Sequence, residues 1–219
     1  MENRSRALAI AAALVGWTAL ALQIGLTVGR VISIGGSVPA ALWLWLGYFT
    51  ITTNLLAAAV LSASARGPKG RASRFLCRPG VQSMTAMSIV IVGLIYNFLL
   101  SGLWQPQGWQ LVADVPLHDV MPLLFLLHWW VNVPKAELRV RQIAWWQLYP
   151  TAYFTYALLR GALDGWYPYP FLDVTTFGYT RVVINAVVIL LAFLAIAWML
   201  VKSGQWQARR SQAGVLPTL

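Results

Sequence analysis

The chain has 219 residues and a formal net charge of +10, yet only 10% of its residues are charged and 59% are hydrophobic. Soluble globular domains carry about 25% charged residues, so this composition excludes an ordinary soluble fold and indicates an integral membrane protein. The single cysteine excludes an intramolecular disulfide framework and a cysteine-based metal cluster.

Six apolar stretches divide the sequence, and each is close to the roughly 20 residues that a helix needs to cross a bilayer. They run over residues 7–28, 40–63, 81–103, 115–133, 143–163 and 182–201. The first stretch is too long for a secretory signal and lacks a convincing cleavage site, so it is interpreted as a retained span. We therefore expect an all-α bundle of six transmembrane helices that forms one domain over residues 1–219.

The basic residues crowd into alternate gaps between these stretches. Of the 16 lysines and arginines, all but Arg30, Arg160 and Arg181 lie before the first stretch, in the second and fourth gaps, or after the sixth. Short cytoplasmic loops retain Lys and Arg, so both termini are expected in the cytoplasm. Because these loops are short and lie beside the membrane, we expect anionic lipid headgroups as their partners, and not nucleic acid.

The second stretch carries a polar segment, YFTITTN, at residues 48–54. Polar side chains inside spans are candidates for function, because burying them in hydrocarbon is unfavourable unless function or pairing compensates. Helical spacing places Gly47, Thr50 and Asn54 on one face. Two interpretations stay open. The segment is either a packing stripe with hydroxyls bonded to carbonyls one turn back, or a site with a threonine nucleophile and Asn54 as oxyanion donor.

The fourth stretch carries His118 near its start, and Pro122 follows four residues later. Pro122 lacks an N–H, so the carbonyl of His118 is expected to lose its helical partner and the helix to kink. A histidine beside a bent, partly wet helix is a candidate general base; the alternative is an interfacial histidine bonded to a loop. Asp114 lies one turn earlier on the same face and can accept the other imidazole N–H, whereas Asp119 points about 100° away.

His128 is the other histidine of the chain. It follows His118 at a distance of about 15 Å along the helix, so the two cannot share one haem or one metal. Its neighbours Trp129 and Trp130 are typical of a membrane boundary, which predicts an anchoring role at the inner interface. We expect neither a metal nor another cofactor.

Three segments together resemble the bacterial six-span membrane protein family found widely in proteobacteria. They are YFTITTNLL at residues 48–56, His118 followed by Pro122, and YPYPFLD at residues 167–173. That family is similar to the androgen-induced-protein-like membrane proteins of animals, which are threonine hydrolases that cleave fatty acid esters of hydroxy fatty acids. The resemblance covers the whole chain at the level of spans, and it implies a location in a bacterial inner membrane.

Carried onto this sequence, the resemblance implies that Thr50, which follows Phe49, is the nucleophile, with Thr52 and Thr53 as rivals. His118 matches the family histidine, which acts as the base. Thr50 would attack the ester carbonyl while His118 takes its proton and later protonates the leaving alcohol. Water entering from the outer side would then hydrolyse the acyl-threonine. Membrane lipids or fatty-acid esters are the implied partners.

Other polar residues are expected to support this chemistry. Asn54, Asn97 or a tyrosine would stabilise the oxyanion, and Arg160 and Arg181 would hold a fatty-acid carboxylate in a bidentate fork. The alternative for both arginines is snorkelling to the outer headgroups.

Two rival functions stay open, a non-catalytic lipid-binding protein and a small-solute transporter. Transport usually needs intramembrane carboxylates, broken helices or inverted repeats, and the predicted spans hold only Asp119 as a carboxylate.

Overall fold

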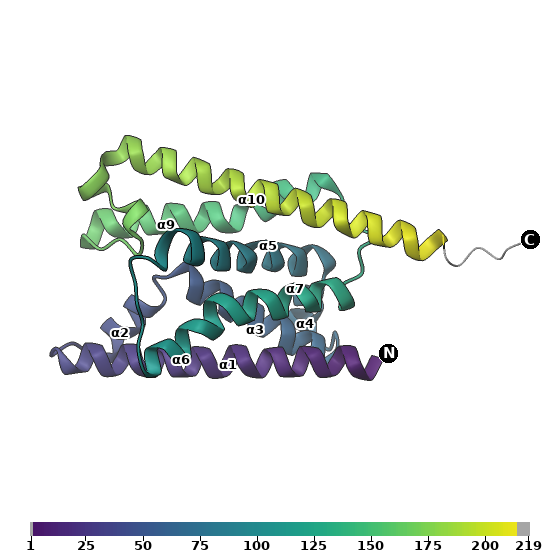
Figure 1. Cartoon of the computed structure of the whole chain (residues 1–219), viewed down its shortest axis with the longest axis horizontal. Coiled ribbons are helices and arrows are strands. Elements are labelled where there is room, and N and C mark those ends of the chain that lie inside the picture. The colour runs from purple at the N-terminus through teal and green to yellow at the C-terminus, as the bar shows by residue number, and fades with distance from the viewer. Residues whose placement is uncertain (1, 214–219) are drawn as a thin grey trace, which may run out of the picture.

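Residues 2–213 are described by the computed structural model, and every regular element among them is helical (Figure 1). The α-helices in chain order are α1 (Glu2–Ser33), α2 (Val38–Trp45), α3 (Phe49–Arg66), α4 (Arg71–Leu76), α5 (Pro79–Ile95), α6 (Trp109–Val115), α7 (Met121–Asn132), α8 (Ile143–Trp146), α9 (Leu148–Asp164) and α10 (Val174–Ala213). Two short π-helices, η1 (Tyr96–Leu100) and η2 (Pro116–Val120), and two 3-10 turns, η3 (Val140–Gln142) and η4 (Pro170–Leu172), complete the set. The prediction of an all-α fold is confirmed for this part of the chain.

Four helical segments of the described chain are long and apolar enough to cross a membrane: Asn3–Ser33, Pro79–Leu100, Trp109–Asn132 and Val174–Arg210. The bent pair α2 and α3 makes a fifth if it is one span. The predicted stretch 143–163 is divided between α8 and α9, and α9 alone has 17 residues. Between residues 2 and 213 there are thus four such helices, or five with the bent pair, where the sequence predicts six.

The outside of the bundle is apolar. Large hydrophobic side chains project from several helices, including Leu163, which is 89% exposed, and Phe98, which is 80% exposed. A contiguous apolar exterior of this kind is typical of a surface that faces lipid. The structure therefore agrees with a membrane protein.

Helix α1 runs along one side of the bundle and α10 along the other, with α5 and α7 between them (Figure 1). Helix α3 packs on α1 and α5, and α5 packs on α7. The N-terminal end of α1 and the C-terminal end of α10 lie at the same end of the bundle (Figure 1). The break between α2 and α3 and the loop before η4 lie at the opposite end, where they surround the candidate site.

The predicted second span is not one continuous helix. Helices α2 and α3 meet at 82°, and Gly47 lies in the break between them. A Cβ at Gly47 would lie 2.3 Å from Arg160 Nη1 and 2.6 Å from the Trp166 ring, so a larger residue would displace both side chains. The expectation that Gly47 shares a helical face with Thr50 and Asn54 is therefore wrong. The break makes Thr50 the second residue of α3, at a helix N-terminus.

Candidate active site

Thr50 and His118 meet between α3 and η2. Thr50 Oγ1 lies 3.3 Å from His118 Nε2, although the two residues are 68 positions apart in the chain. Both side chains are largely buried, Thr50 at 9% exposure. A hydroxyl within hydrogen-bond reach of an imidazole nitrogen is the arrangement of an activated nucleophile and its base.

The other imidazole nitrogen faces Asp114. His118 Nδ1 lies 3.0 Å from the Asp114 backbone carbonyl oxygen and 3.3 Å from its carboxylate Oδ1. A carbonyl can only accept, so Nδ1 must carry the proton and donate it. Nε2 of the neutral ring then presents its lone pair to the Thr50 hydroxyl, which is the tautomer that a general base requires.

The plane of the imidazole is held by Tyr96 of η1. The Tyr96 and His118 rings stack with centroids 3.9 Å apart and planes inclined by 15°. Together with the Asp114 contacts, this stacking fixes the direction of Nε2 towards Thr50. Both rings come from π-helical turns, a conformation that is frequent at functional sites.

The π-turn at η2 changes the carbonyl that Pro122 leaves without a partner. The Met121 N–H donates to the Pro116 carbonyl, five residues back, so in this register the missing Pro122 N–H orphans Leu117. The carbonyl that the π register leaves open is thus that of Leu117, one residue before the predicted His118. Asn54 Nδ2 donates to the Leu117 carbonyl at 3.1 Å and fills the vacant position.

Asn54 therefore ties α3 to η2. Its Nδ2 also donates to the Thr50 carbonyl at 2.9 Å, and the side chain is fully buried. Both amide hydrogens are used, which leaves none for an oxyanion. The structure gives Asn54 a positioning role, because it holds Thr50 and the residue before His118 at a fixed separation.

Gly93 of α5 allows this close approach on the opposite side of η2. A Cβ added at Gly93 would lie 2.9 Å from the His118 carbonyl oxygen and 3.2 Å from Pro122 Cγ. The nearest atom belongs to backbone, so it cannot move aside as the end of a flexible side chain would. Gly93 is thus a packing requirement of the site that no sequence pattern indicated.

Gly93→Ala is expected to destabilise the protein by about 1–3 kcal/mol, as overpacking does in a close-packed interior. Gly25→Ala is the matched control, because Gly25 is also helical and a Cβ there meets nothing within 4 Å. Thermal unfolding in detergent compares the two. A Gly93→Ala protein as stable as Gly25→Ala would show that the α5–η2 contact has room for a Cβ.

Tyr169 lies on the other side of Thr50. The Thr50 backbone N–H donates to the Tyr169 hydroxyl at 3.3 Å, and the side chains of Thr50 and Tyr153 also lie beside that hydroxyl. The ring stacks on Phe171 with centroids 5.2 Å apart. A donor here, next to the N-terminus of α3, suits an anionic oxygen formed at Thr50. The sequence alone does not indicate which tyrosine takes this position.

Two cavities meet at Thr50. The first, here called the polar chamber, has a volume of about 370 Å³, and its wall includes Gln23, Arg30, Thr50, Asp114 and His118. The second, called the apolar slot, has a volume of about 40 Å³.

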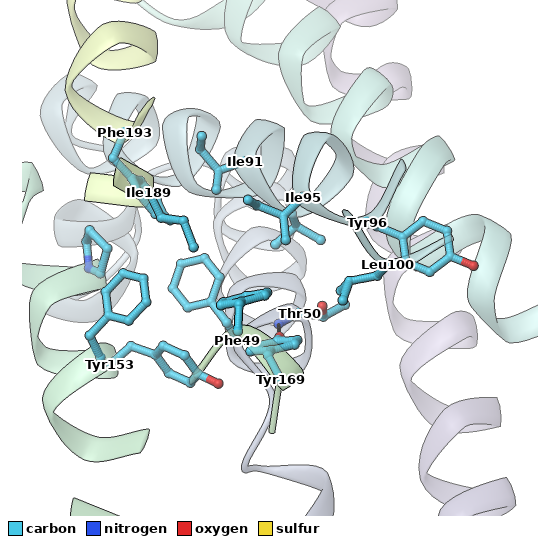
Figure 2. A pocket seen from close by; sticks show the side chains of 14 residues that line it. Phe49, Thr50, Ile91, Ile95, Tyr96, Leu100, Tyr153, Tyr169, Ile189 and Phe193 are labelled. Atoms are coloured by element: carbon cyan, nitrogen blue, oxygen red, sulfur yellow. Dashed lines mark hydrogen bonds between the residues drawn. The ribbon is translucent and has the colours of Figure 1, made fainter. Parts of the chain in front are cut away.

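The slot is almost entirely hydrophobic. In Figure 2, Thr50 and Tyr169 lie together on one wall, and Ile91 and Ile95 of α5 lie across from them. Thr50, Tyr96, Leu100 and Tyr169 line both cavities. The Thr50 hydroxyl therefore stands where an apolar chain and a polar group can be held on either side of it.

Thr52 and Thr53 lie outside both cavities. The Thr52 hydroxyl donates to the Phe49 carbonyl and accepts from Tyr149, and the Thr53 hydroxyl pairs with the same tyrosine. Of the three threonines, Thr50 is the one within reach of His118. Thr52 and Thr53 fit the packing interpretation.

Asn97 and the two predicted arginines do not join the site. Asn97 is exposed and donates to the Asp119 carboxylate at 2.8 Å. Arg160 is 5% exposed and bonds Asp164, and Arg181 is exposed on α10. None of the three lines the polar chamber or the apolar slot.

Arg160 braces the break in the second span. Its guanidinium lies between the rings of Trp43 and Trp166, 4.4 and 4.2 Å from their centroids, and donates to the Trp43 carbonyl. These contacts occupy the group that was expected to hold a carboxylate. Arg160 therefore supports the site only through the position of Gly47 and the start of α3.

His128 lies inside the bundle and not at its surface. It is 1% exposed, and its two ring nitrogens pair with Gln82 at 3.0 Å and with Asn132 at 2.9 Å. It is a packing residue that links α5 and α7, and the prediction of a headgroup anchor is wrong.

Comparison of the chain with protein-family models, with curated proteins and with solved structures finds no match. The geometry around Thr50 therefore carries the functional proposal.

Proposed function

We propose that this protein is an intramembrane hydrolase of long-chain fatty-acid esters, including fatty acid esters of hydroxy fatty acids. Thr50 is its nucleophile and His118 its general base. The observation that carries the proposal is the 3.3 Å contact between Thr50 Oγ1 and His118 Nε2, at the junction of a polar chamber and an apolar slot.

In the proposed reaction, Thr50 Oγ1 attacks the ester carbonyl while its proton passes to His118 Nε2. The carbonyl oxygen becomes an oxyanion, which accepts a hydrogen bond from the Tyr169 hydroxyl beside the N-terminus of α3. The ester C–O bond then breaks, and the proton on Nε2 moves to the departing alcohol oxygen. A water molecule repeats the sequence on the acyl-threonine and releases the fatty acid.

The membrane arrangement that accompanies this proposal has six spans, with both termini in the cytoplasm of a bacterium. The α8–α9 segment would be the fifth crossing and the bent α2–α3 pair the second. The start of α1 and the end of α10 lie at the same end of the bundle, which agrees with an even number of crossings (Figure 1). The basic loops favour that end as the cytoplasmic one.

The test of the proposed function is hydrolysis by the purified protein in detergent, measured on a panel of long-chain acyl esters. The panel includes a branched ester between a fatty acid and a hydroxy fatty acid. Release of free fatty acid above the detergent blank is the expected result. No turnover on any ester would favour a lipid-binding or transport function for the same cavity.

The slot is expected to receive the methylenes of the acyl chain nearest the carbonyl, so narrowing it should alter chain-length preference. Ile91→Phe adds a ring to a side chain that lines the slot. Displacing two methylenes at about 0.8 kcal/mol each corresponds to about a tenfold lower kcat/KM for a palmitoyl ester relative to an acetyl ester.

Val90→Phe is the matched control for Ile91→Phe, because Val90 is the preceding residue and lines a groove on another face of α5. It should leave the ratio of palmitoyl to acetyl turnover unchanged. Equal ratios for both variants would place the acyl chain outside the slot.

A further inference from the structure

Arg30 of α1 is a basic side chain on the wall of the polar chamber. Three arginines, Arg30, Arg160 and Arg181, were expected on the outer side of the membrane. Arg160 is occupied by two tryptophan rings and Asp164, and Arg181 lines neither cavity. Arg30 was not assigned a role from sequence, yet it shares a cavity with Thr50.

The Arg30 guanidinium has no partner among the described residues. The ion pairs there join His118 to Asp114 and Arg160 to Asp164. The Arg30 side chain is exposed and takes part in no hydrogen bond within the same part of the chain. Its five N–H donors are therefore available to a ligand in the chamber.

The remaining lining is suited to an amphipathic molecule. Gln110 Nε2 donates to Gln23 Oε1 at 2.8 Å, and Gln23 Nε2 donates to Thr27 at 3.4 Å, so each amide is partly used within the protein. Leu26, Leu44 and Leu103 supply apolar surface in the same chamber. The chamber thus offers one unpaired cation at the side of a hydrocarbon-lined space.

The charge of the chamber favours a monoanion. Asp114 contributes a carboxylate to the same wall, and its negative charge is directed at His118. One guanidinium matches one carboxylate in a planar, bidentate fork. A dianionic phosphate monoester would meet one cation and one carboxylate, so it is the less suitable ligand.

We propose that Arg30 binds the free carboxylate of the substrate, on the alcohol half of the ester. The methylenes of the acyl chain nearest the carbonyl then lie in the apolar slot, the scissile ester lies at Thr50, and the alcohol half is a hydroxy acid that extends through the polar chamber. The assignment of the two halves rests on the proposed function, but the binding of a carboxylate by Arg30 is measurable without turnover.

The test uses the full-length Thr50→Ala protein in detergent at pH 8, so that no ligand is consumed. Equilibrium binding is measured for radiolabelled 12-hydroxyoctadecanoate and for its methyl ester, which has the same chain without the charge. The acid should bind about five- to tenfold more tightly than the methyl ester, a modest ratio because Arg30 is exposed. Adding Arg30→Gln should reduce the ratio to about one, and Arg30→Lys should retain part of it.

Arg181→Gln is the matched control, because it removes an exposed arginine that lines neither cavity. Added to Thr50→Ala, it should leave the ratio of acid to methyl-ester affinity unchanged. Comparing this ratio between variants also corrects for unequal partitioning of the two probes into detergent. An unchanged ratio in Arg30→Gln, or an equal loss in Arg181→Gln, would overturn the proposal.

Failure of this proposal can be distinguished from failure of the proposed function. If the wild-type protein hydrolyses esters but Arg30→Gln leaves the ratio of acid to methyl-ester affinity unchanged, the role of Arg30 is rejected and the proposed hydrolase is retained. If Arg30→Gln abolishes the preference for the acid over its methyl ester but the wild-type protein turns over no ester, the hydrolase is rejected and the carboxylate site is retained.

Discussion

Thr50→Ala is expected to lower kcat for a long-chain ester by about 10⁴-fold, because it removes the oxygen that forms the acyl intermediate. The Thr50 hydroxyl lies 3.3 Å from the imidazole and borders both cavities, so no other threonine of α3 can replace it without moving the helix. Free fatty acid released per minute by purified protein measures the loss. Thr50→Ser keeps the hydroxyl and should retain a measurable fraction of the rate.

Thr52→Ala is the matched control for this loss. Thr52 lies in the same turn of α3, but its hydroxyl bonds the Phe49 carbonyl and Tyr149 and lies outside both cavities. Its turnover should stay within about threefold of wild type. Full activity in Thr50→Ala, or an equal loss in Thr52→Ala, would assign the nucleophile elsewhere.

His118→Ala is expected to lower kcat by about 10³- to 10⁴-fold, since Thr50 then has no base to take its proton. Asp114 holds Nδ1 and Tyr96 stacks on the ring, so the unsubstituted imidazole is already oriented for this transfer. Elution volume and thermal unfolding in detergent establish that the variant is folded before its rate is compared.

The Thr50→Ala and His118→Ala substitutions should not be additive. When two residues act as one unit, losing the second costs little once the first is gone. The double variant is therefore expected to match the slower single variant. A double variant that is slower by the product of the two single losses would mean that the residues act independently.

Part of this structure could be predicted from the sequence because the physical signals are local. Apolar stretches near 20 residues predict membrane helices, and the described chain is all-helical with several helices of that kind. The polar residues of the second and fourth stretches were also identified as candidates, since burying polar groups in hydrocarbon is unfavourable without a reason. The segments that hold Thr50 and His118 do come together.

Other features depend on partners far along the chain. The break at Gly47 is held by Arg160 and Trp166, more than 100 residues away, so helical periodicity alone predicted a straight span. An α-helical register predicts that Pro122 leaves the His118 carbonyl open, whereas the π-turn also leaves open that of Leu117.

The roles of the polar side chains were hardest to predict. Asn54 and Arg160 were expected to contact substrate, but each spends its donors on backbone carbonyls or neighbouring rings. Arg30 was not expected to bind substrate, because an arginine near a helix end usually only reaches for headgroups. Only the tertiary structure distinguishes an occupied side chain from one that faces a cavity.

The most direct test of the Thr50–His118 pair is to identify the residue that an alkyl fluorophosphonate modifies. An activated hydroxyl attacks the phosphorus and displaces fluoride, which leaves a stable adduct that peptide mass spectrometry can locate. We predict one adduct, on Thr50, formed by the wild-type protein and lost in His118→Ala. An adduct on another residue, or labelling of Thr50 that persists without His118, would contradict the account.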